Sequence, residues 1–325
     1  MKRLAFLLVV AVFWNSCSNE FELTEEWKDI PIVYGLLSMA DTAQYIRVEK
    51  AYLDPNTSAL EQAKIADSIY YQNASLKIIH DQTGDEYNLE MIDGRDDGYF
   101  REPGVFAQEP NYLFKIRTSD IDFIGGDLYR LELDRGNENA IVTAETILVD
   151  EFALFRPLSG TSLRFEDGLN FTFSWRAIES AAFYDLSLEF NYSEQVPNQP
   201  GNPFVNKRVI WKVAENIRTN EFKIQGEEFY QAIASGIEGG LNVPRRIGSI
   251  SVVIEAGGTS LFDFIQVGSA NQGITGSLDL PEFSNLSEGL GVFSSRNEIR
   301  EDGFSLFDST RDSLELGRFT RDLNF

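Results

Sequence analysis

The single cysteine of this 325-residue chain, Cys17, limits how the chain can be held together. One thiol cannot form an internal disulfide, so a folded body must be stabilised by apolar cores. The composition can supply them, because 43% of the residues are hydrophobic and 13% are aromatic. The 25 Phe and 12 Tyr also favour strands over helices. The sequence therefore predicts a β-rich fold that depends on packed aromatic side chains.

The residues before Cys17 have the layout of an export signal. A basic start is followed by an apolar run from Leu4 to Trp14, and the small Ser16 stands directly before the cysteine. The run is about eleven residues long, whereas a membrane-spanning helix needs roughly 20. No later stretch approaches that length. We therefore interpret residues 1–16 as a signal peptide and expect no membrane-spanning helix.

The box Trp14-Asn15-Ser16-Cys17 resembles the bacterial lipobox, although Leu is usual where Trp14 stands. That resemblance implies that the Cys17 thiol carries diacylglycerol and that this residue becomes the N-terminus. Lipidation would also remove a free thiol that is a liability in an oxidising compartment. We expect residues 17–28 to form a flexible acidic tether, similar to the surface-export signals of Bacteroidota lipoproteins, between the lipid and the folded body.

Acidic residues dominate the charge of the body. Removing residues 1–16 takes away two basic residues and no acid, so the formal charge falls from −23 to −25. Such a surface repels phosphate backbones, so nucleic acid is not an expected partner. The charge also argues against adhesion to anionic lipid through a basic patch. The acidic charge is most simply explained by solubility, and a binding site for a cation is the alternative explanation.

Short alternating segments predict strands in the first part of the body. Residues 45–52 alternate apolar and polar side chains, the period of a half-buried strand. Residues 74–80 and 86–91 flank Gln82-Thr83-Gly84-Asp85, which is typical of a hairpin turn. Because further strands continue to residue 149, we assign residues 29–150 to an N-terminal β-sandwich domain.

The second part of the body has a different strand signature. A strand that ends in Trp175 precedes the alternating segment 183–190, which resembles fibronectin type III and related immunoglobulin-like sandwiches. With no disulfide between sheets, Trp175 is expected to fill the core. Residues 226–234 have the pattern of an amphipathic helix, and the last residues suggest another. The predicted fold is mainly β, with two tandem immunoglobulin-like or fibronectin-like β-sandwich domains and one or two short helices. Residues 151–325 form the C-terminal domain and its tail.

Three segments of the body resemble an uncharacterised family of Bacteroidota outer-membrane lipoproteins, a domain-of-unknown-function group with two β-rich halves. They are Ile32 to Leu37, Tyr129 to Thr146 in part, and Leu286 to Phe293, and the last is the most specific. The resemblance covers the mature chain in patches. It implies an outer-membrane location with exposure at the cell surface, and a TonB-dependent transporter or another envelope protein as the partner. It transfers no catalytic residues.

Catalytic residues do not stand out in the sequence. His80 is the only histidine, and the adjacent Asp81 would point to the opposite face of a strand, so the two cannot act as base and orienting acid. We expect His80 to be an exposed residue beside a turn. The 51 acidic residues offer many pairs, but no spacing singles one out. The expectation is a protein that is not an enzyme and needs no cofactor.

One loop, from Asp93 to Gly98, resembles a calcium loop. Asp93, Asp97 and Gly98 match ligand and glycine positions of the EF-hand pattern. Arg95 occupies a ligand position, however, and Gly104 stands where a glutamate is required. A polar turn is therefore the favoured interpretation, and Asp93 and Asp97 remain the metal-ligand candidates.

The sequence is compatible with three functions. The first is a non-enzymatic surface lipoprotein that binds a ligand or serves a transporter as an accessory subunit. The second is a carbohydrate-binding module, for which Trp27 and Trp211 are the stacking candidates because Trp14 leaves with the signal and Trp175 is assigned to the core. The third is a hydrolase that uses paired carboxylates.

Overall fold

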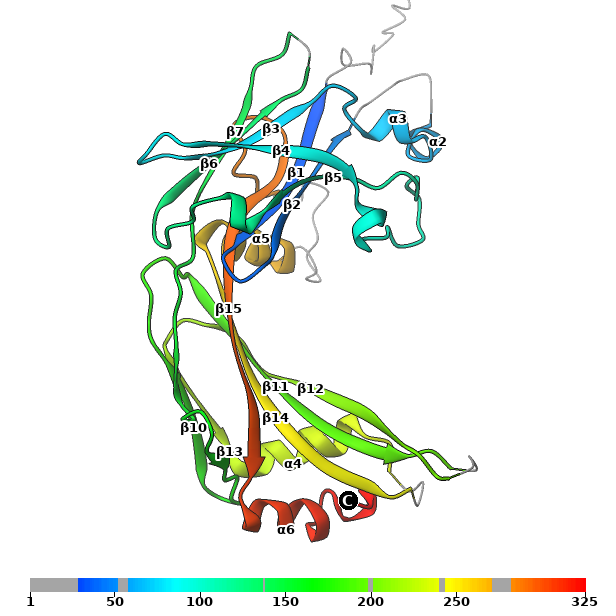
Figure 1. Ribbon diagram of the computed structural model, residues 1–325, viewed down its shortest axis with the longest axis vertical. Helices are drawn as coiled ribbons and strands as arrows, with labels where there is room; N and C mark the ends of the chain where they lie inside the picture. The colour runs from blue at the N-terminus through cyan, green and yellow to red at the C-terminus, as the bar shows by residue number, and fades with distance from the viewer. Residues whose placement is uncertain (1–28, 52–57, 137, 198–200, 240–242, 271–281) are drawn as a thin grey trace, which may run out of the picture.

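The computed structural model describes residues 29–51, 58–136, 138–197, 201–239, 243–270 and 282–325. The predicted signal peptide, Cys17 and the tether with Trp27 lie outside the described residues. The fold is mainly β, as predicted, with two β-rich halves joined by one long strand, β15 (Leu290–Leu306) (Figure 1).

Seven strands form the N-terminal half together with the first part of β15. They are β1 (Ile30–Ser38), β2 (Ala43–Ala51), β3 (Ser75–His80), β4 (Glu86–Asp93), β5 (Tyr112–Arg117), β6 (Leu128–Asp134) and β7 (Val142–Ile147). Their order is β15-β1-β2-β5-β4-β3-β6-β7. The two ends of this sheet meet, because Ala144 of β7 bridges Leu286 just before β15. The sheet thus folds over a core of alternate side chains such as Val33 and Leu131, both 0% exposed.

The C-terminal half is a sandwich of two sheets. The smaller sheet has the order β13-β10-β8, with β8 (Leu154–Arg156), β10 (Asn170–Trp175) and β13 (Glu221–Gln225). The larger sheet has the order β12-β11-β14-β15, with β11 (Phe183–Gln195), β12 (Phe204–Ile217) and β14 (Arg245–Gly257). A two-residue strand, β9 (Ser162–Leu163), pairs with the end of β15. Three strands facing four is the division expected of a fibronectin-like sandwich, and the fully buried Trp175 fills its core as predicted.

Helices are more numerous than the one or two predicted. The described residues contain five short α-helices: α2 (Ala59–Gln62), α3 (Ala66–Ile69), α4 (Gly226–Gly236), α5 (Thr259–Ala270) and α6 (Asp308–Leu316). Single 3₁₀ turns are η1 (Gly94–Asp97), η2 (Thr118–Asp120) and η3 (Arg321–Leu323). Helix α4 confirms the amphipathic pattern. Helix α5 was not expected, because its sequence TSLFDFIQVGSA has no charged residue except one aspartate and so lacks a clear polar face.

Strand β15 belongs to both halves, which corrects the assignment of all of residues 151–325 to the C-terminal domain. Its first residues pair in parallel with β1, from Ile32–Leu290 to Ser38–Arg296. Its later residues pair with β14, ending at Ile250–Phe304. A strand of 17 residues is about 56 Å long, enough to cross from one core to the other. The chain therefore returns to the N-terminal half after completing most of the C-terminal one.

Candidate binding groove

The candidate site lies on the outer face of the β15-β1-β2 region. Along β1 the core-facing residues are buried, whereas Tyr34 points away from the core and is 43% exposed. The strand register places Arg47 of β2 and Val292 of β15 directly beside Tyr34. These three side chains form part of a floor that faces away from the N-terminal core.

Two segments from distant parts of the sequence rise on either side of this floor. Helix α5 contributes Leu261 and Phe264, and the segment around η1 contributes Asp97 and Tyr99. The open cavity between them has a volume of about 760 Å³, within the range of small-molecule sites. We call it the groove, and its lining residues are Tyr34, Gly35, Leu36, Asp41, Thr42, Ala43, Tyr45, Arg47, Asp97, Tyr99, Leu113, Leu261, Phe264, Val292 and Arg296.

Two aromatic pairs line the groove. The rings of Tyr34 and Phe264 meet edge to face, with centroids 6.0 Å apart. Those of Tyr45 and Tyr99 are 4.6 Å apart and tilted by 51°. A smaller hollow of about 200 Å³ also touches Tyr34 and Phe264 and extends along β15. Rings arranged in this way offer flat apolar surfaces to an aromatic side chain or to a sugar ring.

The charged groups of the groove are already paired. Asp97 accepts hydrogen bonds from Lys115 and, at 2.9 Å, from the Tyr45 hydroxyl. Lys115 and then Tyr45 lower the pKa of the Asp97 carboxyl, while burial raises the pKa of Tyr45. Arg47 donates to Glu49 at 3.0 Å and to Asn111 at 2.9 Å. These contacts fix the positions of the Asp97 and Arg47 side chains. Side chains fixed in this way can orient a bound ligand.

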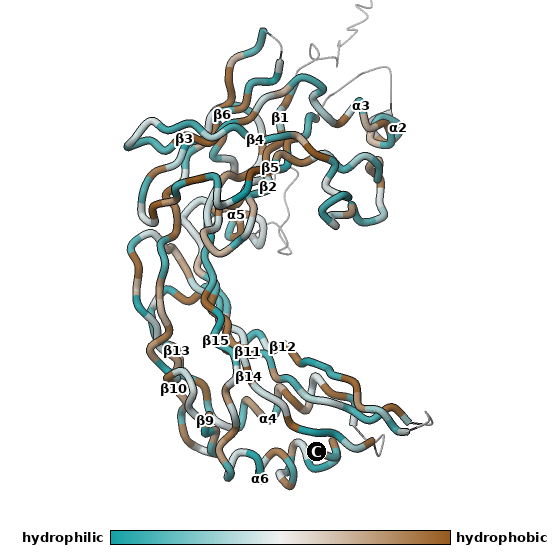
Figure 2. The backbone as a smooth tube through the Cα atoms, in the orientation of Figure 1, coloured by the Kyte–Doolittle hydropathy of each residue, from teal (hydrophilic) through white to brown (hydrophobic). Residues whose placement is uncertain are grey.

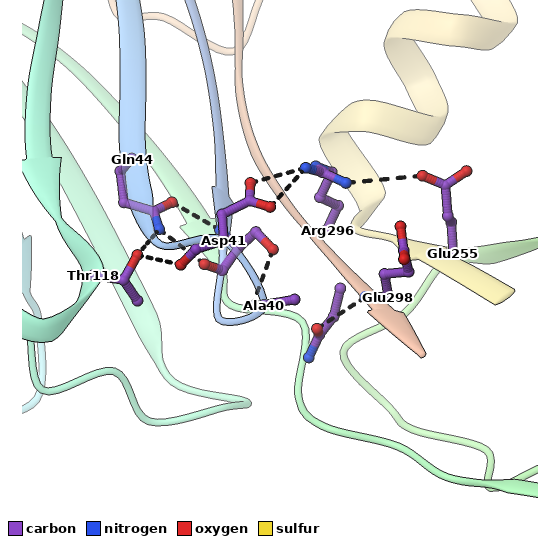
Figure 3. Close-up of polar contacts among 9 residues, drawn as sticks. Ala40, Asp41, Gln44, Thr118, Glu255, Arg296 and Glu298 are labelled. Carbon is purple, nitrogen blue, oxygen red and sulfur yellow. Dashed lines mark hydrogen bonds and ion pairs between the residues drawn. The ribbon is translucent and has the colours of Figure 1, made fainter. Parts of the chain in front are cut away.

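Arg296 closes the end of the groove that faces the C-terminal half. Figure 3 shows its guanidinium between Asp41, in the β1–β2 turn, and Glu255 of β14. The distances are 2.8 and 3.0 Å to the two Asp41 oxygens and 3.8 Å to Glu255. Because Asp41 belongs to the N-terminal half and Glu255 to the C-terminal half, Arg296 links the groove to the junction of the halves.

A row of carboxylates crosses the C-terminal sheet next to this junction. Asp185, Glu255 and Glu298 stand directly opposite one another on β11, β14 and β15. Burial, and then the neighbouring Glu255, raises the pKa of Glu298. Burial also raises the pKa of Asp185. Like charges opposite each other across strands are destabilising, so the ionised row weakens the fold.

Replacing Glu298 with glutamine is therefore expected to stabilise the protein by about 0.5 kcal/mol at pH 7. A raised folded-state pKa means that ionising Glu298 costs stability above the unfolded pKa. The gain should disappear by about pH 3, where the wild-type carboxyl is protonated in both the folded and the unfolded state. Chemical unfolding at about pH 7 and about pH 3 measures the gain. Glu179→Gln, an exposed change before β11, should have no effect, and equal effects of the two changes would contradict the interpretation.

The predicted metal ligands do not converge. Asp93 accepts from the Arg95 side chain at 2.6 and 2.9 Å and caps η1 through the Arg95 backbone N–H, and Arg95 lowers the pKa of this carboxyl. Asp97 points to Lys115 and Tyr45 instead. Within the described residues no group of three or more His, Cys, Asp or Glu side chains could hold a metal ion. Asp93 thus pairs with Arg95 beside η1, and Asp97 forms part of the groove wall.

The structure corrects the expected exposure of His80. The ring is buried, with Nε2 2.8 Å from Asp127 and Nδ1 3.0 Å from the Thr83 hydroxyl, and it stacks on Tyr129 with centroids 4.8 Å apart. Its partner Asp127 is 47 residues away, so the sequence did not reveal it. Thr83 donates to Asp85 at 2.6 Å, and a carboxylate is the stronger acceptor. These contacts connect the hairpin turn to Asp127 and Tyr129.

Trp211 lies apart from the groove. It is half-buried on β12, beside α4, and lines a separate hollow of about 620 Å³ with Glu228 and Gln231. The other stacking candidate, Trp27, is outside the described residues. The aromatic residues that do gather at one site are Tyr34, Tyr45, Tyr99 and Phe264. The alternate positions of β1 on either side of Tyr34 carry Ile32 and Leu36, so the sequence pattern did not indicate an open face there.

Hydrophobic stretches are short along the described chain, and hydrophilic residues interrupt them throughout (Figure 2). None of the described helices has the length and apolar character needed to cross a membrane.

Comparisons with known proteins give little further information. No family model matches the chain, and no curated protein matches it. Among solved structures, the crystal structure of CBD12 from CALX1.2 has 12% identity and a TM-score of 0.18, covering 85% of this chain and 99% of that one. The crystal structure of the calcium binding domain CBD12 of CALX1.1 has 12% identity and a TM-score of 0.16, covering 82% and 98%. TM-scores this low do not support a functional argument. The proposed function therefore depends on the geometry of this chain alone.

Proposed function

We propose that this protein is a lipid-anchored binding or accessory subunit of the outer membrane, exposed at the cell surface, and that it holds a ligand or partner segment in the groove. The groove itself is the observation that carries the proposal. It is open and lined by two aromatic pairs, and its charged side chains Asp41, Arg47, Asp97 and Arg296 each have an ion-pair partner. Aromatic side chains are enriched among the residues that dominate binding energy.

A TonB-dependent transporter is the proposed partner. The family resemblance of the sequence motivates this choice, and the lipid on Cys17 would place the body beside such a membrane protein. Aromatic side chains such as Tyr34 and Phe264 would then contact the partner, while Arg47 and Arg296 would orient it. The strong negative charge of the body favours a partner with a complementary basic surface.

The alternative function is carbohydrate binding at the same groove. Exposed Tyr34 and Tyr99 offer flat faces for sugar rings, and Asp41 and Asp97 offer acceptors for hydroxyl groups. Calorimetry with soluble oligosaccharides separates the two functions. A sugar site predicts binding that Tyr34→Ala abolishes and Trp211→Ala leaves intact, and no binding to any oligosaccharide favours the protein partner.

Replacing Cys17 with serine is expected to release the protein from the membrane. Without the thiol no diacylglycerol can be attached, so the covalent anchor is lost. Fractionation should find the wild type in the outer membrane and Cys17→Ser in unlipidated form outside it. Intact-mass analysis of the wild type should give a chain that starts at Cys17 and carries diacylglyceryl. A mature chain with a free Cys17 thiol would refute the anchor.

A further inference from the structure

Exposed large apolar side chains gather in two neighbouring segments of the N-terminal half. One segment includes α2 and α3, and the other is the loop between η1 and β5 (Figure 1). Their exposed fractions lie between 47% and 73%. We call this set the apolar loop surface, and its members are Leu60, Ile65, Phe100, Val105 and Phe106. Exposed apolar side chains concentrated in this way mark an interaction site.

The two segments are held against each other. The backbone N–H of Ala107 donates to the carbonyl of Ala63 at 2.7 Å. Arg101 is paired with Glu49 of β2, and its guanidinium lies 5.3 Å from the centre of the Phe106 ring. The apolar loop surface is therefore built on the sheet at a fixed place.

That place is next to the point where the tether enters the fold. Asp29, the residue before β1, accepts a hydrogen bond of 2.5 Å from Tyr71, which follows α3. Buried Arg135 lies 3.6 Å from the same carboxylate. Twelve residues, 17–28, join Cys17 to this position, and twelve residues span at most about 40 Å. A lipid on Cys17 thus keeps this end of the molecule close to the bilayer.

We infer that the apolar loop surface seats on the lipid bilayer that carries the anchor, an inference that rests on the proposed lipidation of Cys17. A single acyl-type anchor gains from a second contact, and aromatic rings such as Phe100 and Phe106 are suited to the interface between headgroups and acyl chains. The contact is apolar, so the −25 charge of the mature body does not prevent it and high salt should not weaken it. Contact between the apolar loop surface and the bilayer would fix the direction in which the groove faces.

The test uses the full lipidated chain with one added cysteine, because Cys17 is the only natural thiol and is blocked in the mature protein. Phe100→Cys carries a polarity-sensitive fluorophore. Leu316→Cys, 78% exposed on α6 at the far end of the molecule, is the matched control (Figure 1). Both are reconstituted into vesicles of phosphatidylethanolamine and phosphatidylglycerol that contain lipids with quenchers at known depths.

The expected result is a blue-shifted label at position 100, quenched at a depth of about 5–10 Å below the headgroup surface, and an unquenched label at position 316. Raising the salt to 1 M should leave the quenching unchanged. If both labels stay in water while the mass shows diacylglyceryl at Cys17, the inference is wrong and the anchor stands. If the mass shows no lipid on Cys17, the proposed anchor and the proposed bilayer contact are both wrong. Shielding of position 100 only when an outer-membrane protein is added, with no lipid quenching, would replace the bilayer with a protein partner.

Discussion

Replacing Trp175 with alanine is expected to lower the free energy of unfolding by about 3–5 kcal/mol. The side chain is 0% exposed between the two sheets of the C-terminal half, and its ring lies 5.3 Å from that of Tyr184. Its indole Nε1 has no hydrogen-bond partner among the described residues, so the loss comes from packing. The sandwich has no disulfide, so no covalent cross-link compensates for the cavity that the alanine would leave.

Denaturant unfolding followed by tyrosine fluorescence and circular dichroism measures this loss. Trp211→Ala is the matched control, since it removes the same side chain from a half-buried position on β12. It should cost much less than the Trp175 change. If the two variants lose the same stability, the packing assigned to Trp175 is wrong.

Replacing Gly291 with alanine is expected to cost about 3 kcal/mol or more. The residue has φ = 120°, which side chains rarely adopt, and a Cβ would overlap the carbonyl oxygen of Val33 on β1. Its position is where β15 pairs in parallel with β1, directly below the groove. Separation of these strands would open the N-terminal sheet and displace Val292 from the groove floor.

Hydrogen exchange of the β1 and β15 amides measures this effect strand by strand. Faster exchange is expected in both strands, with unchanged exchange in β10 and β13. Gly268→Ala on α5 is the control, because no atom lies within 4 Å of the added methyl group and no unusual φ is required. Unchanged protection of β1 in Gly291→Ala would contradict the strand pairing.

Much of the fold follows from local sequence pattern. Alternation located most strands, and the position of Trp175 identified the C-terminal core. Pattern alone could not show that β15 continues from one half into the other, because pairing with β1 joins residues some 260 positions apart. Helix α5 was missed for a related reason, since it packs against β15 and its apolar residues do not form a regular amphipathic stripe.

The groove was harder to predict than the fold. It brings together residues from four regions of the sequence. Tyr34 and Phe264 meet because α5 packs on β15, which in turn pairs with β1. Asp93 and Asp97 are spaced like ligands of a calcium loop, which is why they remained weak metal-ligand candidates beside the favoured polar turn. In the structure Asp93 pairs with Arg95 and Asp97 with Lys115, which lies 18 residues beyond it. Long-range pairing is the information that local motifs lack.

Purification of the lipidated protein from its own outer membrane in mild detergent tests the central proposal most directly. The account predicts a stable complex of fixed stoichiometry with an outer-membrane protein. Tyr34→Ala combined with Phe264→Ala should weaken it by about 2 kcal/mol or more, roughly thirtyfold, whereas Trp211→Ala should retain it. A wild-type protein that is always monomeric and without a partner, or a groove variant that keeps its partner, would contradict the proposed function.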